Sequence, residues 1–204
     1  MFVPRTSPPR ILVIPGSLGS EAPDVRLAAL ASKELTLADA EVTRISLADY
    51  PLPLYDADLA DGAGLPPNAR KLKQLVCAHS GVFITGPEYH ASCAPLLSNA
   101  IHWIAVVRDP GEPRLAAFQD RAFALGAAAW GSSGGLQALL ALRQLLAVGC
   151  RALVIAEQVA VPQAESAFDE MDHLANADAA AQLRTVVRRL IEYAHMLRRT
   201  ERVM

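Results

Sequence analysis

The chain has 204 residues and a formal net charge of -2, with 52% hydrophobic and 20% charged residues. This composition excludes a disordered protein, and the length suits one domain with a large core. The near-neutral charge gives no basis for binding nucleic acid or an anionic membrane, and no apolar run is long enough to span one. We therefore expect neither kind of partner. The cysteines, three in number and without CxxC spacing, indicate reduced thiols in a cytoplasmic protein.

The predicted elements alternate along the chain. Residues 1–9 contain three prolines, so we expect a flexible tail followed by a single domain over residues 10–204. Short apolar runs predict strands, and apolar residues at helical spacing predict helices. The predicted strands are 11–14, 42–46, 82–84, 122–126 and 152–155, and the predicted helices begin near residues 23, 65, 96, 136 and 178.

Three stretches between these elements have a distinct composition. Residues 50–55 are too rich in proline for a central strand and predict a loop. Residues 108–120 predict a second loop, which could close over a site. Residues 168–174 predict a short helix or an ordered loop.

Alternating strands and helices indicate an α/β protein. Right-handed crossovers then produce a parallel sheet between two layers of helices. Two strand orders are compatible with this pattern: the flavodoxin-like order 2-1-3-4-5, and half of a dinucleotide-binding fold. Five strands in 204 residues favour the first order, so we predict a flavodoxin-like, three-layer sandwich with a five-stranded parallel sheet.

Three unusual loops follow the first, third and fourth predicted strands. In the order 2-1-3-4-5 they meet at one crevice, outside the carboxyl ends of the strands, where such folds bind ligands. The first, Gly16–Ser20, is small enough for its amides to face an anion at a helix N-terminus. The second contains Glu88, Tyr89 and His90, and the third runs from Trp130 to Gly135.

These loops carry a family resemblance over residues 10–196. The chain resembles the NAD(P)H-dependent FMN reductases, flavodoxin-like flavoproteins that include quinone, azo-dye and chromate reductases. Family members carry a G-S-x-R-x-x-S-x-N phosphate loop, a P-x-Y-N-x-S-x-P loop followed by L-K-N-A-I-D-W, and a glycine-rich loop before a helix ending in L-R-x-x-L. The corresponding segments here are 16–24, 87–94, 97–103, 134–137 and 142–146, and the proline-rich segment 50–55 is also similar.

The resemblance implies an NAD(P)H-dependent reductase that passes hydride or electrons through bound FMN to a small quinone-like, azo or similar acceptor. It implies a homodimer or homotetramer and no obligatory catalytic side chain. The five histidines show no helical i, i+4 pairing with a carboxylate or cysteine that is typical of a metal site, so we expect no metal. The first loop would hold the FMN phosphate, the second would contact the isoalloxazine edge through its backbone, and the third would line the ring. The implied cofactor-binding residues are Gly16, Ser17, Leu18, Gly19, Pro87, Glu88, Tyr89, His90, Trp130 and Gly131.

The departures from the family pattern lie mainly in the phosphate loop. Gly19 replaces the family arginine, Ala22 replaces the serine, and Asp24 replaces the asparagine. The loop therefore loses a cation and gains a carboxylate, which opposes a phosphate. Arg26 is a possible compensating cation. A family member that has lost or altered FMN binding is therefore the alternative to a reductase. Elsewhere, His90 replaces an asparagine, Ala94 a proline and Gln137 a frequent arginine.

A serine esterase is a further alternative. Residues 131–135 match the G-x-S-x-G pattern of a nucleophile elbow between a strand and a helix. Ser133 would then be the nucleophile, with an aspartate and a histidine from the later chain. A second hydrolase arrangement would use Ser17 with Glu170 and His173. The partners available to Ser133 are Asp169 or Asp172, and His173 or His195.

Overall fold

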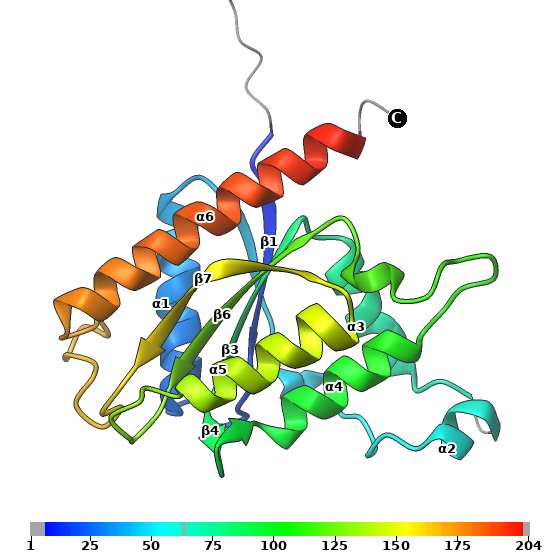
Figure 1. The fold of residues 1–204 in the computed structure, drawn as a ribbon, viewed down its shortest axis with the longest axis horizontal. Coiled ribbons are helices and arrows are strands. Elements are labelled where there is room, and N and C mark those ends of the chain that lie inside the picture. Colours follow the sequence, from blue (N-terminus) through cyan, green and yellow to red (C-terminus); the bar gives the residue numbers. More distant parts are fainter. Residues whose placement is uncertain (1–6, 63, 202–204) are drawn as a thin grey trace, which may run out of the picture.

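A five-stranded parallel sheet forms the centre of the protein, described here by a computed structural model for residues 7–62 and 64–201 (Figure 1). Its strand order is β2-β1-β3-β6-β7, which is the predicted order 2-1-3-4-5 when the five sheet strands are counted along the chain. The flavodoxin-like, three-layer prediction is confirmed. The strands are β1 (Arg10–Pro15), β2 (Glu41–Arg44), β3 (Gly81–Gly86), β6 (Ala122–Ala128) and β7 (Leu153–Val161).

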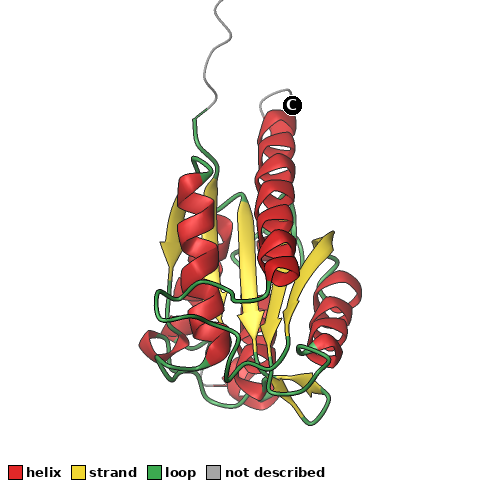
Figure 2. Cartoon of the chain, turned by 90° about the vertical axis from the view of Figure 1, so that its left-hand side faces the viewer, coloured by secondary structure: helices red, strands yellow, loops and turns green. Residues whose placement is uncertain are grey.

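Helices cover both faces of the sheet (Figure 2). Successive strand residues point to opposite faces, so Phe83 packs in one core cluster while Val82 and Ile84 pack in the other. Because both faces are covered, the central strands are continuously apolar. One layer contains α1 (Pro23–Leu37) and α6 (Ala177–Glu201), and the other contains α3 (Pro67–Cys77), α4 (Pro95–Val106) and α5 (Leu136–Arg143).

Several local features differ from the prediction. A two-stranded hairpin, β4 (Glu88–Tyr89) with β5 (Ser92–Cys93), follows β3, and a short helix, α2 (Ala57–Gly62), follows the proline-rich loop. Of the predicted tail, residues 1–6 lie outside the described part, but Pro9 is buried and its carbonyl accepts from the Glu41 amide at 2.9 Å. Packing therefore begins before residue 10. The single domain over 10–204 stays a prediction.

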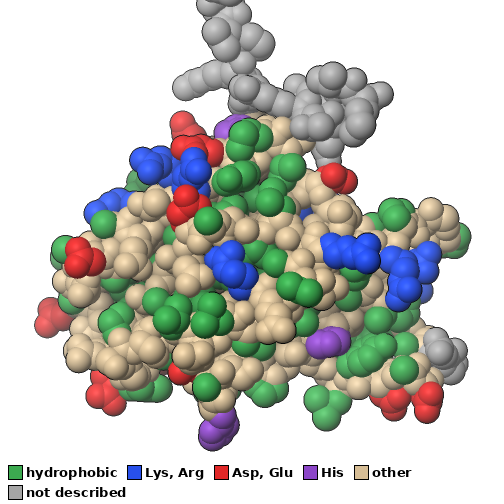
Figure 3. Space-filling model, viewed as in Figure 1, with side chains coloured by type: hydrophobic (Ala, Val, Ile, Leu, Met, Phe, Trp, Pro, Cys, Tyr) green, Lys and Arg blue, Asp and Glu red, His purple; other side chains and the backbone are tan. Residues whose placement is uncertain are grey.

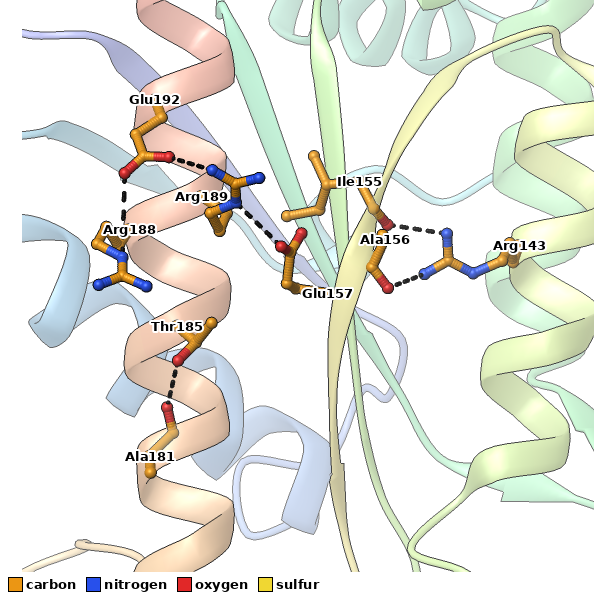
Figure 4. A network of polar contacts seen from close by, with 9 residues as sticks. All are labelled: Arg143, Ile155, Ala156, Glu157, Ala181, Thr185, Arg188, Arg189 and Glu192. Carbon is orange, nitrogen blue, oxygen red and sulfur yellow. Dashed lines mark hydrogen bonds and ion pairs between the residues drawn. The ribbon is translucent and has the colours of Figure 1, made fainter.

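The edge strand β7 is longer than predicted and irregular. Its register against β6 shifts between Phe123 and Leu125. Arg143 of α5 binds the resulting bulge by donating to the Ile155 carbonyl at 2.8 Å and to the Ala156 carbonyl at 3.4 Å (Figure 4). From the other side, Arg189 of α6 donates to Glu157 at 2.9 Å. Arginines from both helical layers therefore hold the bulge.

The loop over residues 108–120 does not cover the carboxyl edge of the sheet. It connects the end of α4 to the start of β6, so it lies at the opposite, amino edge. Lys73 of α3, only 4% exposed, donates to Asp109 at 3.1 Å and pairs with Glu112. The expectation that this loop closes over the site is wrong, because the chain direction places it at the other end and a buried lysine holds it there.

Candidate functional site

A crevice of about 500 Å³ opens at the carboxyl ends of β1, β3 and β6. All three predicted loops contribute to it, as the strand order requires. Its volume lies within the range of small-molecule sites. The charged residues of the lining are mostly acidic. The crevice residues used below are Ser17, Glu21, Ala22, Asp24, Arg26, Pro87, Glu88, Tyr89, Trp130 and Glu165.

In the first loop, a carboxylate of the protein occupies two backbone donors. Asp24 Oδ2 accepts from the amides of Gly16 and Ser17, each at 3.0 Å. Asp24 is 0% exposed, and its second oxygen, Oδ1, is buried without a hydrogen-bond partner. Burial raises the pKa of this carboxyl, and the hydrogen bonds from Ser17 and Gly16 oppose that shift only in part.

The rest of this loop is open. Among the described residues, no acceptor receives the amides of Leu18, Ser20 or Glu21. A Cβ added at Gly19 would meet no atom within 4 Å, whereas one added at Gly16 would lie 2.5 Å from the Leu97 side chain. The loop therefore follows the core closely at its start and is free of side chains at Gly19.

The second loop is the β4–β5 hairpin. Its turn residues, His90 and Ala91, have φ of 51° and 57°. Two consecutive positive φ angles characterise the tight turns that favour asparagine and glycine, and histidine tolerates this region better than most residues. Pro87, Glu88 and Tyr89 line the crevice. His90 is exposed and does not line the crevice among the described residues, so its predicted contact with a cofactor stays a prediction.

The third loop requires glycine for its shape. Gly134 has φ of 63°, and an added Cβ would lie 2.9 Å from backbone atoms of Ala160 and Pro162. This close approach sets the loop directly on the end of β7. Trp130 lines the crevice with 64% of its surface exposed, and Tyr89 is 52% exposed. Two aromatic side chains therefore border the opening.

Glu88 joins the second loop to the third. Its Oε2 accepts from the amides of Gln137 and Ala138, at 3.0 and 3.3 Å, in the first turn of α5. A carboxylate at a helix N-terminus satisfies free amides and the helix dipole. Sequence reasoning assigned Glu88 only a backbone role. Because the contact spans 49 residues of sequence, the one available signal was an acidic residue in a loop predicted to adjoin a helix start.

The hydrolase alternatives find no assembled site. Of the residues that they require, only Ser17 lines the crevice among the described part of the chain. Ser17 donates its amide to Asp24, and among the described residues no histidine lines the crevice. His173 lies 3.0 Å from Lys33 and 3.5 Å from Asp169, in the loop before α6. That loop is ordered and irregular, as one of the two predictions for residues 168–174 stated.

Comparison with known proteins identifies the family. The family model for NADPH-dependent FMN reductases matches residues 9–166. The chain belongs to the NADPH-dependent FMN reductase family. A relative, the NAD(P)H-dependent FMN reductase of Pseudomonas aeruginosa, is 31% identical over 140 residues, which cover 68% of this chain and 71% of that protein. The quinone reductase of Escherichia coli is 34% identical over 101 residues, half of each chain.

Solved structures confirm the fold of this NADPH-dependent FMN reductase family member. The flavoenzyme NAD(P)H:(acceptor) oxidoreductase of Paracoccus denitrificans superposes with a TM-score of 0.73 at 22% identity, covering 92% of this chain and 98% of that one. A Bacillus anthracis azoreductase superposes with a TM-score of 0.59 at 16% identity, covering 93% of this chain and 98% of that one. The resemblance inferred from sequence motifs is therefore confirmed.

The L-S-N-A-I-H-W motif of α4 has a structural task in this member of the FMN reductase family. Asn99 accepts from the Tyr55 amide and donates to the Pro53 carbonyl, both at 2.8 Å. Trp103, fully buried, donates its indole N–H to the same carbonyl at 2.8 Å. The motif thus fixes the proline-rich loop. Among the described residues, neither side chain lines the crevice.

The family cofactor, FMN, fits the crevice unevenly. The ring end offers a cavity of adequate volume, aromatic borders and two loops locked by Glu88 and Gly134. The other end, beside the first loop and called the tail end below, has glycine at position 19 and so no cation there. The nearby Arg26 pairs with Asp172 at 2.6 Å. Two like unit charges about 5 Å apart repel by about 3 kcal/mol at an effective dielectric of 20. The residues fit the flavin ring and do not fit a phosphate dianion.

Proposed function

We propose that this protein is an NAD(P)H-dependent flavin oxidoreductase that transfers reducing equivalents to a small quinone-like or azo acceptor. The observation that carries the proposal is the crevice, built from the three loops by which the family is recognised, at the carboxyl edge of the sheet. The name of the E. coli relative supports a quinone-like acceptor. The azoreductase among the structural neighbours adds the azo class on fold alone.

In this proposal the loops bind one flavin along the crevice. The backbone of Pro87, Glu88 and Tyr89 adjoins the ring edge, and Trp130 with Gly131 borders the ring. The small first loop receives the tail. The residues proposed for these contacts are Gly16, Ser17, Leu18 and Gly19 at the tail, and Pro87, Glu88, Tyr89, His90, Trp130 and Gly131 at the ring; of these, Ser17, Pro87, Glu88, Tyr89 and Trp130 line the crevice.

The chain's own contribution is binding, orientation and exclusion of water. The flavin supplies the hydride and electron chemistry when it is bound. Locked loops suit this task, because a donor and an acceptor react only when they are held in close, aligned contact. Glu88 has both of its described bonds directed to α5, so we assign it a positioning role rather than proton transfer.

We further propose a homodimer or homotetramer in the cytoplasm. Uncharged and apolar side chains cover much of the face over α4 and α5 (Figure 3). Leu136 and Leu140 of α5 are 40% and 50% exposed, which supports an interface there.

The three cysteines are free thiols, which supports a reducing compartment. Among the described residues, no helix is long and apolar enough to cross a membrane.

Two measurements on the purified full chain test the function. Titration with FMN and with riboflavin, followed by flavin fluorescence, measures binding. Oxidation of NADPH or NADH with benzoquinone present then measures turnover. We expect flavin binding and quinone-dependent turnover, both weakened in Trp130→Ala. Val148→Ala is the matched control, because Val148 is 75% exposed and lies outside the crevice lining. Failure of both flavins to bind would overturn the proposal.

A further inference from the structure

The first loop of the crevice already holds a buried carboxyl group at the place that the family resemblance assigns to a phosphate. Asp24 takes the amides of Gly16 and Ser17, and both bonds are 3.0 Å long. The side chain is fully buried, and its second oxygen has no partner. An anion placed at this helix N-terminus would therefore meet a buried carboxyl group that already takes the amides of Gly16 and Ser17.

The surroundings add to this opposition. Glu21 and Glu165 both line the crevice and are exposed. Arg26 is the sole Lys or Arg in the lining within the described residues, and it lies 2.6 Å from Asp172 and 4.5 Å over the Phe168 ring. Recruiting its guanidinium to a phosphate would break both contacts. The tail end of the crevice is thus acidic, with its one cation already engaged.

The same end still offers neutral hydrogen-bond donors. Within the described residues, the amides of Leu18, Ser20 and Glu21 have no acceptor, and the space beside Gly19 is open; of these residues Glu21 lines the crevice and the others adjoin its lining in the same loop. A backbone amide can donate to a hydroxyl oxygen, and a hydroxyl group is uncharged, so its binding needs no neighbouring cation. A polyhydroxylated, uncharged chain is therefore chemically better matched to this loop than a phosphate monoester, which carries between one and two negative charges at neutral pH.

We propose that this crevice selects its flavin by the charge of the tail, and that it binds riboflavin at least as tightly as FMN. This selectivity is set by the carboxyl group of Asp24 and by glycine at position 19, which supplies no cation. The inference rests on the proposed flavin oxidoreductase function and deepens it. It replaces the phosphate role that the family resemblance implies for the first loop.

The test compares the two flavins on the full-length protein by equilibrium titration, so its readout is binding and not turnover. For the wild type we expect the Kd for FMN to equal or exceed that for riboflavin. Gly19→Arg restores the family cation at a position where an added Cβ meets no atom within 4 Å. We expect it to tighten FMN binding about tenfold, since hydrogen bonds to charged groups are strong, and to leave riboflavin within about twofold.

Gly19→Gln is the matched control. It has a long side chain without a charge, so it should leave the ratio of the two Kd values near that of the wild type. Asp24→Asn should shift the ratio toward FMN in the same direction as Gly19→Arg. Wild-type binding of FMN more than about threefold tighter than riboflavin, or equal gains for both flavins in Gly19→Arg, would overturn the inference and leave the proposed function intact. Absence of binding by either flavin would overturn both.

Discussion

The two ends of the crevice are built in different ways. At the ring end, contacts to neighbouring elements hold the loops: the Glu88 side chain accepts from amides at the start of α5, and Gly134 packs against the end of β7. At the tail end, the loop is closed by Asp24, a residue of its own helix. The departures from the family motif lie mainly at the tail end, where Gly19 replaces an arginine and Asp24 an asparagine. We infer that the tail end differs from the family mainly in charge.

The ring end depends most on Gly134. In Gly134→Ala, the new Cβ would lie 2.9 Å from backbone atoms that have no rotamer by which to move away, at a φ of 63°. We expect a loss of about 3 kcal/mol in the free energy of unfolding, measured by denaturant titration, from left-handed strain and overpacking together. Gly131→Ala is the control, because its nearest neighbour is the Ser133 hydroxyl at 4.0 Å. A loss of stability in Gly134→Ala no larger than that in Gly131→Ala would contradict this prediction, because the loop would then have moved to accommodate the new Cβ.

Glu88 gives the next largest effect. Glu88→Ala leaves two amides of the first turn of α5 without their acceptor, and we expect a loss of about 1–2 kcal/mol in stability. Because the ring walls loosen together, the affinities for FMN and riboflavin should fall by similar factors. Glu88→Gln keeps an acceptor oxygen and should recover about half of the stability. A selective loss of FMN affinity in Glu88→Ala would contradict the division between the two ends.

Sequence patterns were sufficient for the fold and for the set of loops at the site. Buried parallel strands such as β3 are continuous apolar runs, and the connections then determine the strand order almost alone. Because strand order determines which loops meet, the crevice could be placed before any coordinates were known. The proline-rich loop was predicted as well, since proline is unsuited to a central strand.

What could not be predicted are contacts between residues that lie far apart in sequence, and the direction of side chains. The bond from Glu88 to Gln137 depends on the rotamer of a loop residue, which leaves no periodic signal. The pairing of Arg26 with Asp172 spans 146 residues. By contrast, the opposing charge of Asp24 was visible in the motif itself, because a helix start eight residues after Gly16 brings the carboxyl close to the loop amides.

Asp24 makes a pH-dependent prediction for the tail end. Its pKa in the folded protein is raised above its usual value of 3.8 by burial, so folding favours the protonated acid. The protonated Asp24 side chain therefore contributes to stability at low pH, and this contribution is lost as the pH rises through the pKa of Asp24 in the folded protein. Asp24→Asn keeps an acceptor for Gly16 and Ser17 without the charge. We expect it to be more stable than the wild type by about 1 kcal/mol at pH 7, because burying a neutral amide costs less than burying a carboxylate.

The control for this prediction is the same pair of proteins at about pH 4. Because its pKa is raised, the wild-type carboxyl is protonated to a greater extent at about pH 4 than at pH 7, so the difference in unfolding free energy should shrink. Thermal or denaturant unfolding across this range measures it. A difference that grows toward low pH would mean that the carboxylate is stabilised in the loop. In that case the tail end would already be a satisfied anion site.

Substitution of Arg26 should have the smallest effect on stability. It tests whether Arg26 supplies a cation to the phosphate at the tail end. Arg26→Gln removes an ion pair with a 67% exposed aspartate and a cation–π contact, so we expect a loss of only about 0.5 kcal/mol in stability. Because the guanidinium is engaged by Asp172, the affinity for FMN should change by less than about twofold relative to riboflavin. Asp172→Asn is the reverse test: it releases the guanidinium, and a selective gain in FMN binding is then expected. A tenfold selective loss of FMN affinity in Arg26→Gln would instead assign Arg26 to the phosphate, and the tail end would have kept the family charge through a different residue.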